Sequence, residues 1–463
     1  MLRLLALLVS LGLMASAQKP VYWLLWFDTE DFVEPASDDV ALELARGLTQ
    51  RGVRATFKVV GEKARVLEQR GRGDVVQALS AHDIGYHTNF HSVHPAPAEY
   101  LSQMGLLDGA AEFARRERAG FDDVERIFHV TPSCFGQPGN SWAPQANLAL
   151  REWGVRVYMD DAGQVGLNQR PFWFGGMLYV FNLGPHTVRA GLDDASKLED
   201  AKRRFDAAIA SARQQDGVVQ TYYHPTEWAA TKFWDAVNFS HGANPERESW
   251  QRPPLRTEES RRQAYRIFFD FVDHARATPG VRIVTSRDLP ALFEPRDQAA
   301  PVATARHLAE SIDTRDGFSA ADQLLTLLGL PPQHVDGPLR RVASTDARTE
   351  IPRALFERAK ADAAAFVRKT GRLPDQVWTG AQAISLPDFA ATLAADSGAG
   401  LVKVRAGRLD IERYIGRDAQ KLYNWVIHPE GFAPESLLEM ARLQAWTLKP
   451  ARLAASRTAT RGE

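Results

Sequence analysis

Three carboxylic acids stand close together near the start of the chain, directly after an apolar run. The run is VYWLLWF, residues 21–27, and Asp28-Thr29-Glu30-Asp31 follows it. An apolar run of this length indicates a buried strand. Like charges at the end of such a strand repel one another unless a cation or a shared proton offsets the repulsion. Asp28, Glu30 and Asp31 are therefore candidates for acid–base chemistry and for binding a cation.

Four of the 12 histidines fall within one short segment, HDIGYHTNFHSVH, residues 82–94. His87 and His91 stand four residues apart, so on one helical turn both imidazoles would face the same side. With one carboxylate they would form the open three-ligand metal site that hydrolytic metals use, which leaves a position for water.

His224 ends another apolar, strand-like segment, VVQTYYH, residues 218–224. The pKa of an imidazole is near neutral, which suits a group that protonates a departing amine. His224 is therefore a candidate general acid.

Alternating strand-like and helix-like segments from residue 21 to about 295 would position these side chains. The strand-like segments are 21–27, 53–60, 83–87, 155–159, 173–183, 218–224 and 281–285, and the helix-like ones are 38–51, 61–80 with a break at Gly-Arg-Gly, 97–118, 143–153, 195–215 and 256–277. This order predicts a parallel α/β fold, either a doubly wound sheet or, as the length favours, a distorted (β/α) barrel of about seven strands. In such a fold the working residues lie at the carboxyl ends of the strands.

The alternation stops at PRDQAAP, residues 295–301. Beyond it, helical periodicity dominates at 318–329, 351–370, 387–396 and 431–448. We predict one catalytic α/β domain over residues 18–295 and a smaller, mainly helical accessory domain over residues 301–463.

The first residues, MLRLLALLVSLGLMASA, have one arginine, an apolar stretch and an Ala-Ser-Ala end. This is the pattern of a secretory signal peptide over residues 1–17, with cleavage near Ala17, and it predicts a secreted, periplasmic or cell-envelope protein. The stretch is too short for a membrane span, and no later segment is long and apolar enough for one. A net charge of −1 without a basic block argues against nucleic acid as a partner.

The acids after the first strand, the HTNFH segment at 87–91 and the strand-final His224 stand in the order found in polysaccharide deacetylases of the NodB-homology type, carbohydrate esterase family 4. The family pattern runs T-F-D-D-G, then H-[ST]-x-x-H, then R-x-P-[YG], then an Asp/Trp segment, then L-x-x-H. HTNFH fits the second motif completely, and the resemblance covers residues 20–295. It implies a NodB-like barrel and a hydrolase that removes acyl groups from amino sugars of a polysaccharide or peptidoglycan.

The resemblance also implies roles for the matching residues. Asp28 would be the general base that activates a water molecule, and His224 the general acid. His87 and His91 would be ligands of a divalent metal, expected to be Zn²⁺.

A carboxylate completes the metal site in this family, close after the base. The spacing here is D-T-E-D instead of D-D. Either Glu30 or Asp31 could therefore fill that position.

The chain departs from the family pattern at three places. Gly136 stands where the family has an arginine that orients the base, so another cation, Lys58 or Arg156, would have to replace it. Gly139 could still offer its amide to an oxyanion. Thr221 replaces a leucine that lines the acyl pocket, which suggests a different acyl group or substrate.

The third departure is the segment VYMDDAG, residues 157–163, which matches the family's Asp/Trp segment only loosely. Asp160 or Asp161 would orient His224, or would only start a turn.

In the C-terminal part, residues 366–395, FVRKTGRLPDQVWTGAQAISLPDFAATLAA, resemble a pseudomurein-binding repeat. The resemblance implies an accessory domain that holds the protein on cell-wall polymer. A helical domain packed on the barrel is the alternative.

Three functional hypotheses follow. The favoured one is an exported, metal-dependent deacetylase of an N-acylated glycan or peptidoglycan. The second is a C–N hydrolase of a small non-sugar amide, which Thr221 and Gly136 favour. The third is a cell-surface glycan-binding protein whose metal site does not turn over, which the missing arginine and the resemblance to a wall-binding repeat favour.

Overall fold

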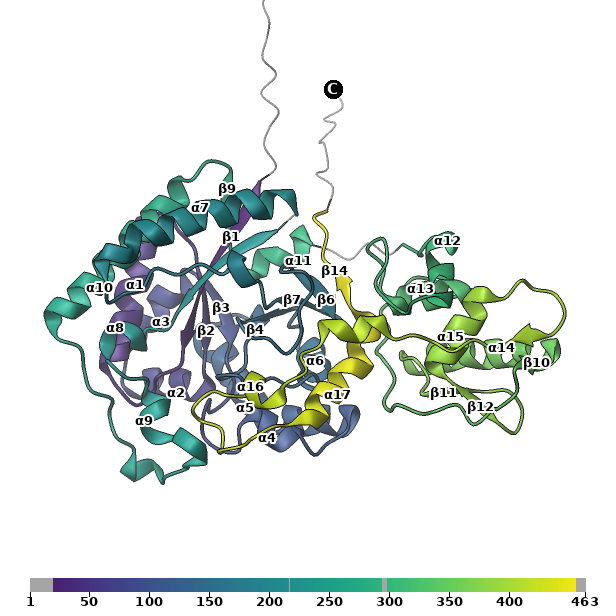
Figure 1. The fold of residues 1–463 in the computed structure, drawn as a ribbon. Helices are drawn as coiled ribbons and strands as arrows, with labels where there is room; N and C mark the ends of the chain where they lie inside the picture. Colours follow the sequence, from purple (N-terminus) through teal and green to yellow (C-terminus); the bar gives the residue numbers. More distant parts are fainter. Residues whose placement is uncertain (1–19, 216, 294–297, 455–463) are drawn as a thin grey trace, which may run out of the picture.

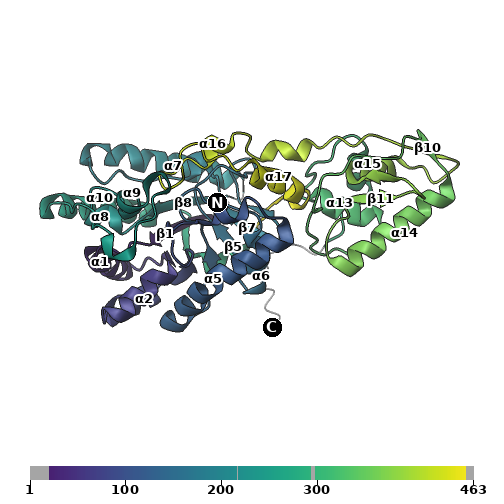
Figure 2. The ribbon, with the colours of Figure 1, turned by 90° about the horizontal axis from the view of Figure 1, so that it is seen from below.

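The computed structural model describes residues 20–215, 217–293 and 298–454. A larger α/β lobe carries most of the chain, and a smaller lobe lies beside it, with α17 between them (Figures 1 and 2). The predicted signal peptide lies outside the described residues. No described helix combines the length and the apolar character needed to cross a membrane.

Ten of the described strands form one curled sheet, in the order β14-β6-β7-β5-β4-β3-β2-β1-β8, with β9 beside β1. The pairings are parallel except for β6 with β7 and β14 with β6. The predicted distorted barrel of parallel strands is confirmed, as an open and curled sheet. Its strands are β1 (Val21–Thr29), β2 (Thr56–Val59), β3 (Asp83–Tyr86), β4 (Cys134–Phe135), β5 (Val157–Met159), β6 (Phe172–Phe174), β7 (Met177–Val180), β8 (Val218–Tyr223), β9 (Val281–Val284) and β14 (Lys449–Pro450).

Helices cover the outer face of this sheet (Figure 1). The helices of this part of the chain are α1 (Ala36–Gln50), α2 (Gly61–Gln69), α3 (Gly73–Ser80), α4 (Pro97–Leu101), α5 (Leu106–Phe128), α6 (Ala146–Glu152), α7 (Leu198–Gln214), α8 (Thr226–Ala229), α9 (Trp234–Asn238), α10 (Glu258–Ala277) and α11 (Leu289–Leu292). Leu289 of α11 packs instead with Leu24 and Trp26 on the opposite face of the sheet. The predicted break in segment 61–80 separates α2 from α3. Helices follow most of the parallel strands along the chain, as the crossover between two parallel neighbours requires.

β1 lies at the centre of the fold and is buried along its whole length. Its odd-numbered residues pack into the core between sheet and helices, whereas its even-numbered residues pack into a second core on the concave side. Because side chains alternate along a strand, Asp28 continues the even-numbered, concave face.

Segment 173–183 differs from its prediction as one strand. It forms the antiparallel hairpin of β6 and β7, because Gly175 and Gly176 turn the chain with φ values of 54° and 76°. Glycine adopts such positive φ angles without the steric cost of a Cβ.

The smaller lobe has its own hydrophobic core, formed by residues between 308 and 402 together with Trp446. Its elements are α12 (Val302–Ala305), α13 (Ala320–Leu327), β10 (Glu350–Ile351), α14 (Arg353–Thr370), β11 (Gln376–Trp378), β12 (Ala383–Ser385), α15 (Leu386–Ala395) and β13 (Val402–Lys403). Two short antiparallel ladders, β10 with β13 and β11 with β12, accompany the helices.

The chain then returns to the larger lobe through α16 (Ala419–Leu422), α17 (Glu435–Gln444) and β14. Apolar residues from Ile411 to Leu448 belong to the main core, and β14 extends the main sheet by pairing with β6. The segment from about residue 409 to 450 therefore packs as part of the larger lobe, although it follows the smaller lobe in the sequence.

Candidate active site

The end of β1 places two of the three acids on the concave side of the sheet. Asp28 and Glu30 are almost fully buried there, at 4% and 3% exposure. Asp31 is also buried, but its Oδ1 atom accepts hydrogen bonds from the amides of Val33 and Glu34, and its Oδ2 atom accepts one from the Thr226 hydroxyl. The Asp31 carboxylate therefore stabilises the turn after β1 and does not join Glu30.

His87 and His91 converge, although the segment between them is not the helical turn that their spacing predicts. Residues 87–91 form a compact turn after β3, with φ values of 64° at Thr88 and 53° at His91. The Thr88 hydroxyl accepts a hydrogen bond from the His91 amide at 3.1 Å, which closes the turn. A left-handed conformation at a β-branched residue such as Thr88 is costly and occurs mainly at functional sites.

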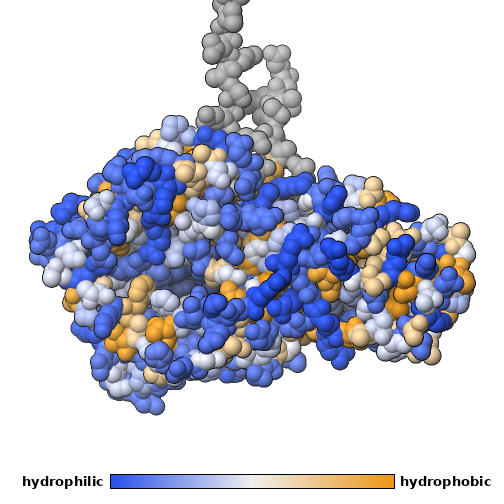
Figure 3. All heavy atoms as spheres, viewed as in Figure 1, coloured by the Kyte–Doolittle hydropathy of each residue, from blue (hydrophilic) through white to orange (hydrophobic). Residues whose placement is uncertain are grey.

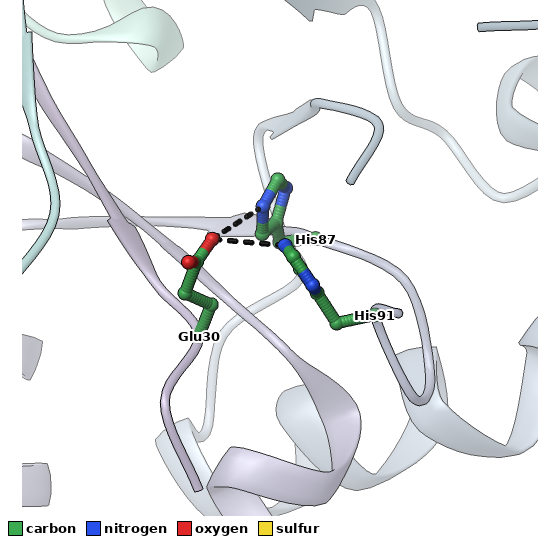
Figure 4. A group of neighbouring side chains, drawn as sticks. All are labelled: Glu30, His87 and His91. Atoms are coloured by element: carbon green, nitrogen blue, oxygen red, sulfur yellow. Dashed lines mark ion pairs between the residues drawn. The ribbon is translucent and has the colours of Figure 1, made fainter. Parts of the chain in front are cut away.

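Glu30, His87 and His91 form one buried cluster (Figure 4). The Oε2 atom of Glu30 lies 3.4 Å from Nε2 of His87 and 2.9 Å from Nε2 of His91. One ligand atom from each residue lies within 4.8 Å of the other two. Among the described residues, the buried Nε2 atom of His91 contacts only the Glu30 carboxylate, and that contact lacks hydrogen-bond geometry, so both atoms can serve as donors to a shared cation.

The second ring nitrogen of each histidine contacts a protein acceptor. Nδ1 of His87 lies 2.9 Å from the carbonyl oxygen of Gly136, and Nδ1 of His91 lies 2.6 Å from the Ser92 hydroxyl. Such contacts fix the tautomer that leaves Nε2 available. Two imidazoles and one carboxylate match the donor set of an open, hydrolytic zinc site, so the residues fit a divalent cation.

His224 faces the opposite side of Asp28. Its Nε2 atom lies 3.5 Å from Oδ2 of Asp28, while Oδ1 of Asp28 lies 3.6 Å from Nδ1 of His87. The Nδ1 atom of His224 lies 2.9 Å from Oε1 of Glu227, which also accepts a hydrogen bond from the His224 amide. Glu227 therefore orients the His224 ring, the role for which the sequence suggested Asp160 or Asp161.

The charges around His224 favour its protonated form. Burial lowers the pKa of His224, but the negative charges of Glu30, Glu227 and Asp28 outweigh burial and raise the pKa to about 9. Arg189 pairs with Glu227 on the far side and stacks over the rings of Tyr222 and Tyr223, 4.6 Å from each centroid. Arg189, Glu227 and His224 thus form a continuous chain of opposite charges.

Lys58 pairs directly with Asp28. Its Nζ atom lies 2.8 Å from Oδ1 of Asp28 and 3.9 Å from Oδ2 of Asp160, and its side chain is fully buried. A Cβ atom added to Gly136 would lie 2.1 Å from Nζ of Lys58. Glycine at 136 therefore gives Lys58 the space to reach Asp28, and of the two cations that the sequence suggested, Lys58 is the one in contact with Asp28.

One cavity of about 220 Å³ brings these groups together. Asp28, Glu30, His87, His91 and His224 all line it. Gly139 also lines it. Thr221 is not brought there, because it lies on the helix side of β8, where its hydroxyl accepts a hydrogen bond from the Trp23 indole.

The sequence interpretation did not identify Glu227, Arg189, Asp235 or Trp425, which also line the cavity. Glu227 could have been found from the sequence. It stands three residues after the strand-final His224, and an acid at that spacing can accept a hydrogen bond from the histidine amide, as in a capping box. Trp425 gave no such signal, because it comes from the segment that returns after the smaller lobe.

No family model and no curated protein sequence matches the chain. Among solved structures, the chain is similar to a protein from Mycobacterium smegmatis described as a polysaccharide deacetylase, with 15% identity over 59% of this chain and 89% of that chain, and a TM-score of 0.39. It is similar to a family 4 carbohydrate esterase from Streptomyces lividans, with 16% identity over 44% of this chain and 79% of that one, and a TM-score of 0.25. It is also similar to a family 4 pseudoenzyme from Bacillus anthracis, with 12% identity over 45% and 56% of the two chains, and a TM-score of 0.28.

Proposed function

We propose that this protein is an exported, metal-dependent hydrolase that removes N-acyl groups, acetyl in the simplest case, from amino sugars of a glycan or peptidoglycan. The observation that carries the proposal is the joint placement of a three-ligand cluster, a separate carboxylate and a charged histidine in one cavity. Hydrolysis of an amide needs these three parts, namely a Lewis acid, a base for water and an acid for the amine.

A divalent cation such as Zn²⁺, bound by Glu30, His87 and His91, would polarise the acyl carbonyl and make an adjacent water more acidic. Asp28 lies next to this cluster but is not one of its three ligand residues, so its carboxylate can accept the proton of the attacking water. Lys58, which is not among the residues that line the cavity, holds the Asp28 carboxylate through a contact of 2.8 Å. Water adds to the acyl carbon and its proton passes to Asp28, which leaves an oxyanion on the former carbonyl.

Gly139 lines the cavity, and its amide would donate to the developing oxyanion. The carbon–nitrogen bond then breaks and the nitrogen takes a proton from Nε2 of His224. The products are the free amine of the sugar and the carboxylic acid. Glu227 and Arg189 act behind His224 by fixing its ring and supporting its positive charge.

Acetate release tests this proposal directly. We expect the zinc-loaded protein to release acetate from N-acetylated chito-oligosaccharides or peptidoglycan, and the Asp28→Asn variant to keep zinc but lose turnover. His87→Ala is expected to lose zinc. Full zinc retention by His87→Ala would contradict the ligand assignment, and no acetate from any glycan would contradict the substrate class.

A second candidate, a hydrolase of a small non-sugar amide, gains support from the cavity. Its volume of about 220 Å³ is smaller than the roughly 300–1,000 Å³ of pockets that enclose larger organic ligands. Turnover of cyclic ureides without turnover of chito-oligosaccharides would favour this candidate.

The third hypothesis, a metal site without turnover, rested on the missing arginine and on the resemblance to a wall-binding repeat. Lys58 supplies a positive charge beside Asp28 and so weakens the first of these arguments. The proposal that the smaller lobe holds the protein on cell-wall polymer can be tested separately, by measuring whether Trp378→Ala, which removes an exposed aromatic of β11, lowers binding to cell-wall sacculi.

A further inference from the structure

Trp425 brings the C-terminal segment into the cavity. It lines the same cavity as Glu30, His87 and His91. Its indole covers Gly139 so closely that a Cβ added there would lie 2.5 Å from Cδ1 of Trp425. Its ring also packs edge-on against Phe233, with 5.8 Å between centroids.

The backbone on both sides of Trp425 is anchored to the larger lobe. Before it, the Tyr423 hydroxyl donates to the carbonyl oxygen of Trp142 at 3.0 Å. After it, the carbonyl oxygens of Val426 and Ile427 accept hydrogen bonds from the amides of residues 241 and 242, at 2.8 and 2.9 Å.

Apolar packing adds to these hydrogen bonds. Ile427 is fully buried in a cluster with Phe32 and Trp234, close to the end of β1. The segment that carries Trp425 is therefore fixed on the larger lobe, and Trp425 is its contribution to the cavity wall.

Trp425 also contacts the groups that support the histidines. Its Nε1 atom donates to Oδ2 of Asp235 at 2.9 Å, and the same oxygen accepts from the Ser92 hydroxyl at 3.3 Å. Ser92 in turn contacts Nδ1 of His91. The wall and the cation cluster are thus joined by one buried hydrogen-bond chain, which fixes the distance between them.

A glycan bound with one acyl group at the cluster meets this wall directly. Phe233 packs edge-on against both His224 and Trp425, so aromatic rings continue from the general acid to the edge of the cavity. A sugar chain can extend away from the wall but not through it. The wall therefore limits how much of a chain can lie on the side of Gly139.

We propose that Trp425 is a specificity-determining residue that restricts the substrate to short chains or chain ends. This inference rests on the proposed action on N-acylated glycans. It distinguishes a protein that acts at chain ends from one that acts along the interior of a polymer, where a cleft must be open on both sides.

Equilibrium binding tests the inference without relying on turnover. The probes are N-acetylglucosamine dimer and hexamer, and the protein is the full-length, zinc-loaded Asp28→Asn variant, compared with Asp28→Asn/Trp425→Ala. Because a chain can still extend away from the wall, calorimetry with the first protein gives the reference ratio of the dimer and hexamer dissociation constants. With the second, this ratio should change by at least about tenfold in favour of the hexamer, because new contacts form on the opened side.

Two further variants separate the wall from other effects. Trp425→Phe retains a ring over Gly139 and loses only the donor to Asp235, so it should keep the length dependence of the parent. Trp378→Ala removes an exposed tryptophan of the smaller lobe and should also leave the length dependence of binding unchanged. The same length dependence with and without Trp425, or no binding of either probe, overturns the inference, whereas a failure of acetate release in the wild type overturns the proposed function instead.

Discussion

The Nζ atom of Lys58 lies 2.8 Å from Oδ1 of Asp28, and only a glycine at 136 leaves room for it there. The two positions lie on different segments, one in β2 and the other after β4. Lys58 is held by three further contacts, with the carbonyl oxygen of Met159 at 3.0 Å, with Asp160, and with the face of Trp26 at 4.0 Å. Burial lowers the pKa of Lys58, but the charges of Asp28 and Asp160 outweigh it, so the amine is charged.

The first prediction concerns Lys58. Lys58→Met keeps the length of the side chain but removes the charge that faces Asp28. We expect kcat for acetate release to fall by about 10- to 100-fold, the range for residues that orient an active-site group, with zinc content unchanged. The loss of the partner of the buried Asp28 should also lower stability by about 3–5 kcal/mol.

A second buried lysine provides the control for that stability loss. Lys63 is 1% exposed and pairs with Asp38, outside the cavity. Lys63→Met should therefore lower the melting temperature while kcat per folded molecule stays within about threefold of the wild type. Equal losses of kcat in both variants would show that Lys58 acts only through stability.

The second prediction separates Glu30 from Asp31, between which the sequence could not decide. Glu30→Gln should weaken zinc binding by more than about 100-fold, because it removes a charged ligand atom. Asp31→Asn should keep zinc, because Asp31 is engaged by two backbone amides and Thr226. Competition with a chelator, read as zinc content, measures both variants, and the reverse result would assign the ligand to Asp31.

The third prediction concerns the pH dependence of His224. Neighbouring carboxylates raise its pKa to about 9, so the acid form is present below that pH and is lost as the pH rises through it. Glu227→Gln removes one of these negative charges, so the basic limb of kcat/KM should move to lower pH by about one unit. The profile is measured on zinc-loaded protein for both wild type and variant, because the charge of the cation lowers the pKa of His224 in both.

An unchanged basic limb in Glu227→Gln would show that another group sets it. Glu117 offers the matched control. It is a buried acid whose Oε2 atom accepts hydrogen bonds from the Tyr86 hydroxyl and the Asn89 backbone amide. Glu117→Gln keeps the hydrogen-bonding shape, lies outside the cavity lining and should leave the basic limb in place.

The sequence predicted those parts of the site that depend on single strands. Asp28 and His224 each follow an apolar run, so their place at one edge of a parallel sheet could be derived from the runs alone. The convergence of His87 and His91 was predicted for a wrong reason, since their turn is closed by Thr88 in a left-handed conformation and is not helical. Spacing alone cannot distinguish these two geometries.

Contacts between distant segments were beyond such reasoning. That Lys58 and not Arg156 reaches Asp28 depends on which side chain the curled sheet points inward. Trp425 contacts Phe233 and Asp235 only because the chain returns after the smaller lobe. No local pattern of hydrophobic residues encodes that return.

The last prediction follows from this return and concerns the boundary predicted near residue 301. A chain that ends at residue 300 would lack the buried residues from Ile411 to Leu448 and the edge strand β14. Each large apolar side chain lost from a core costs about 2–5 kcal/mol, so the combined loss exceeds the stability of about 5–15 kcal/mol of a typical domain. We expect this truncated chain to be insoluble or unfolded, and to bind no zinc.

Removal of the smaller lobe alone should have a different outcome. The amide of Ile312 donates to the carbonyl oxygen of Arg408 at 2.8 Å, and the amide of Ile411 donates back to Ile312 at 3.0 Å, so the two ends of the lobe lie side by side. A variant in which a short Gly-Ser linker replaces residues 313–407 should therefore keep the larger lobe, with reduced stability because Trp446 loses its neighbours. Circular dichroism melting and zinc content measure both shortened chains, and a folded, zinc-binding chain of residues 18–300 would show that the returning segment is dispensable for the site.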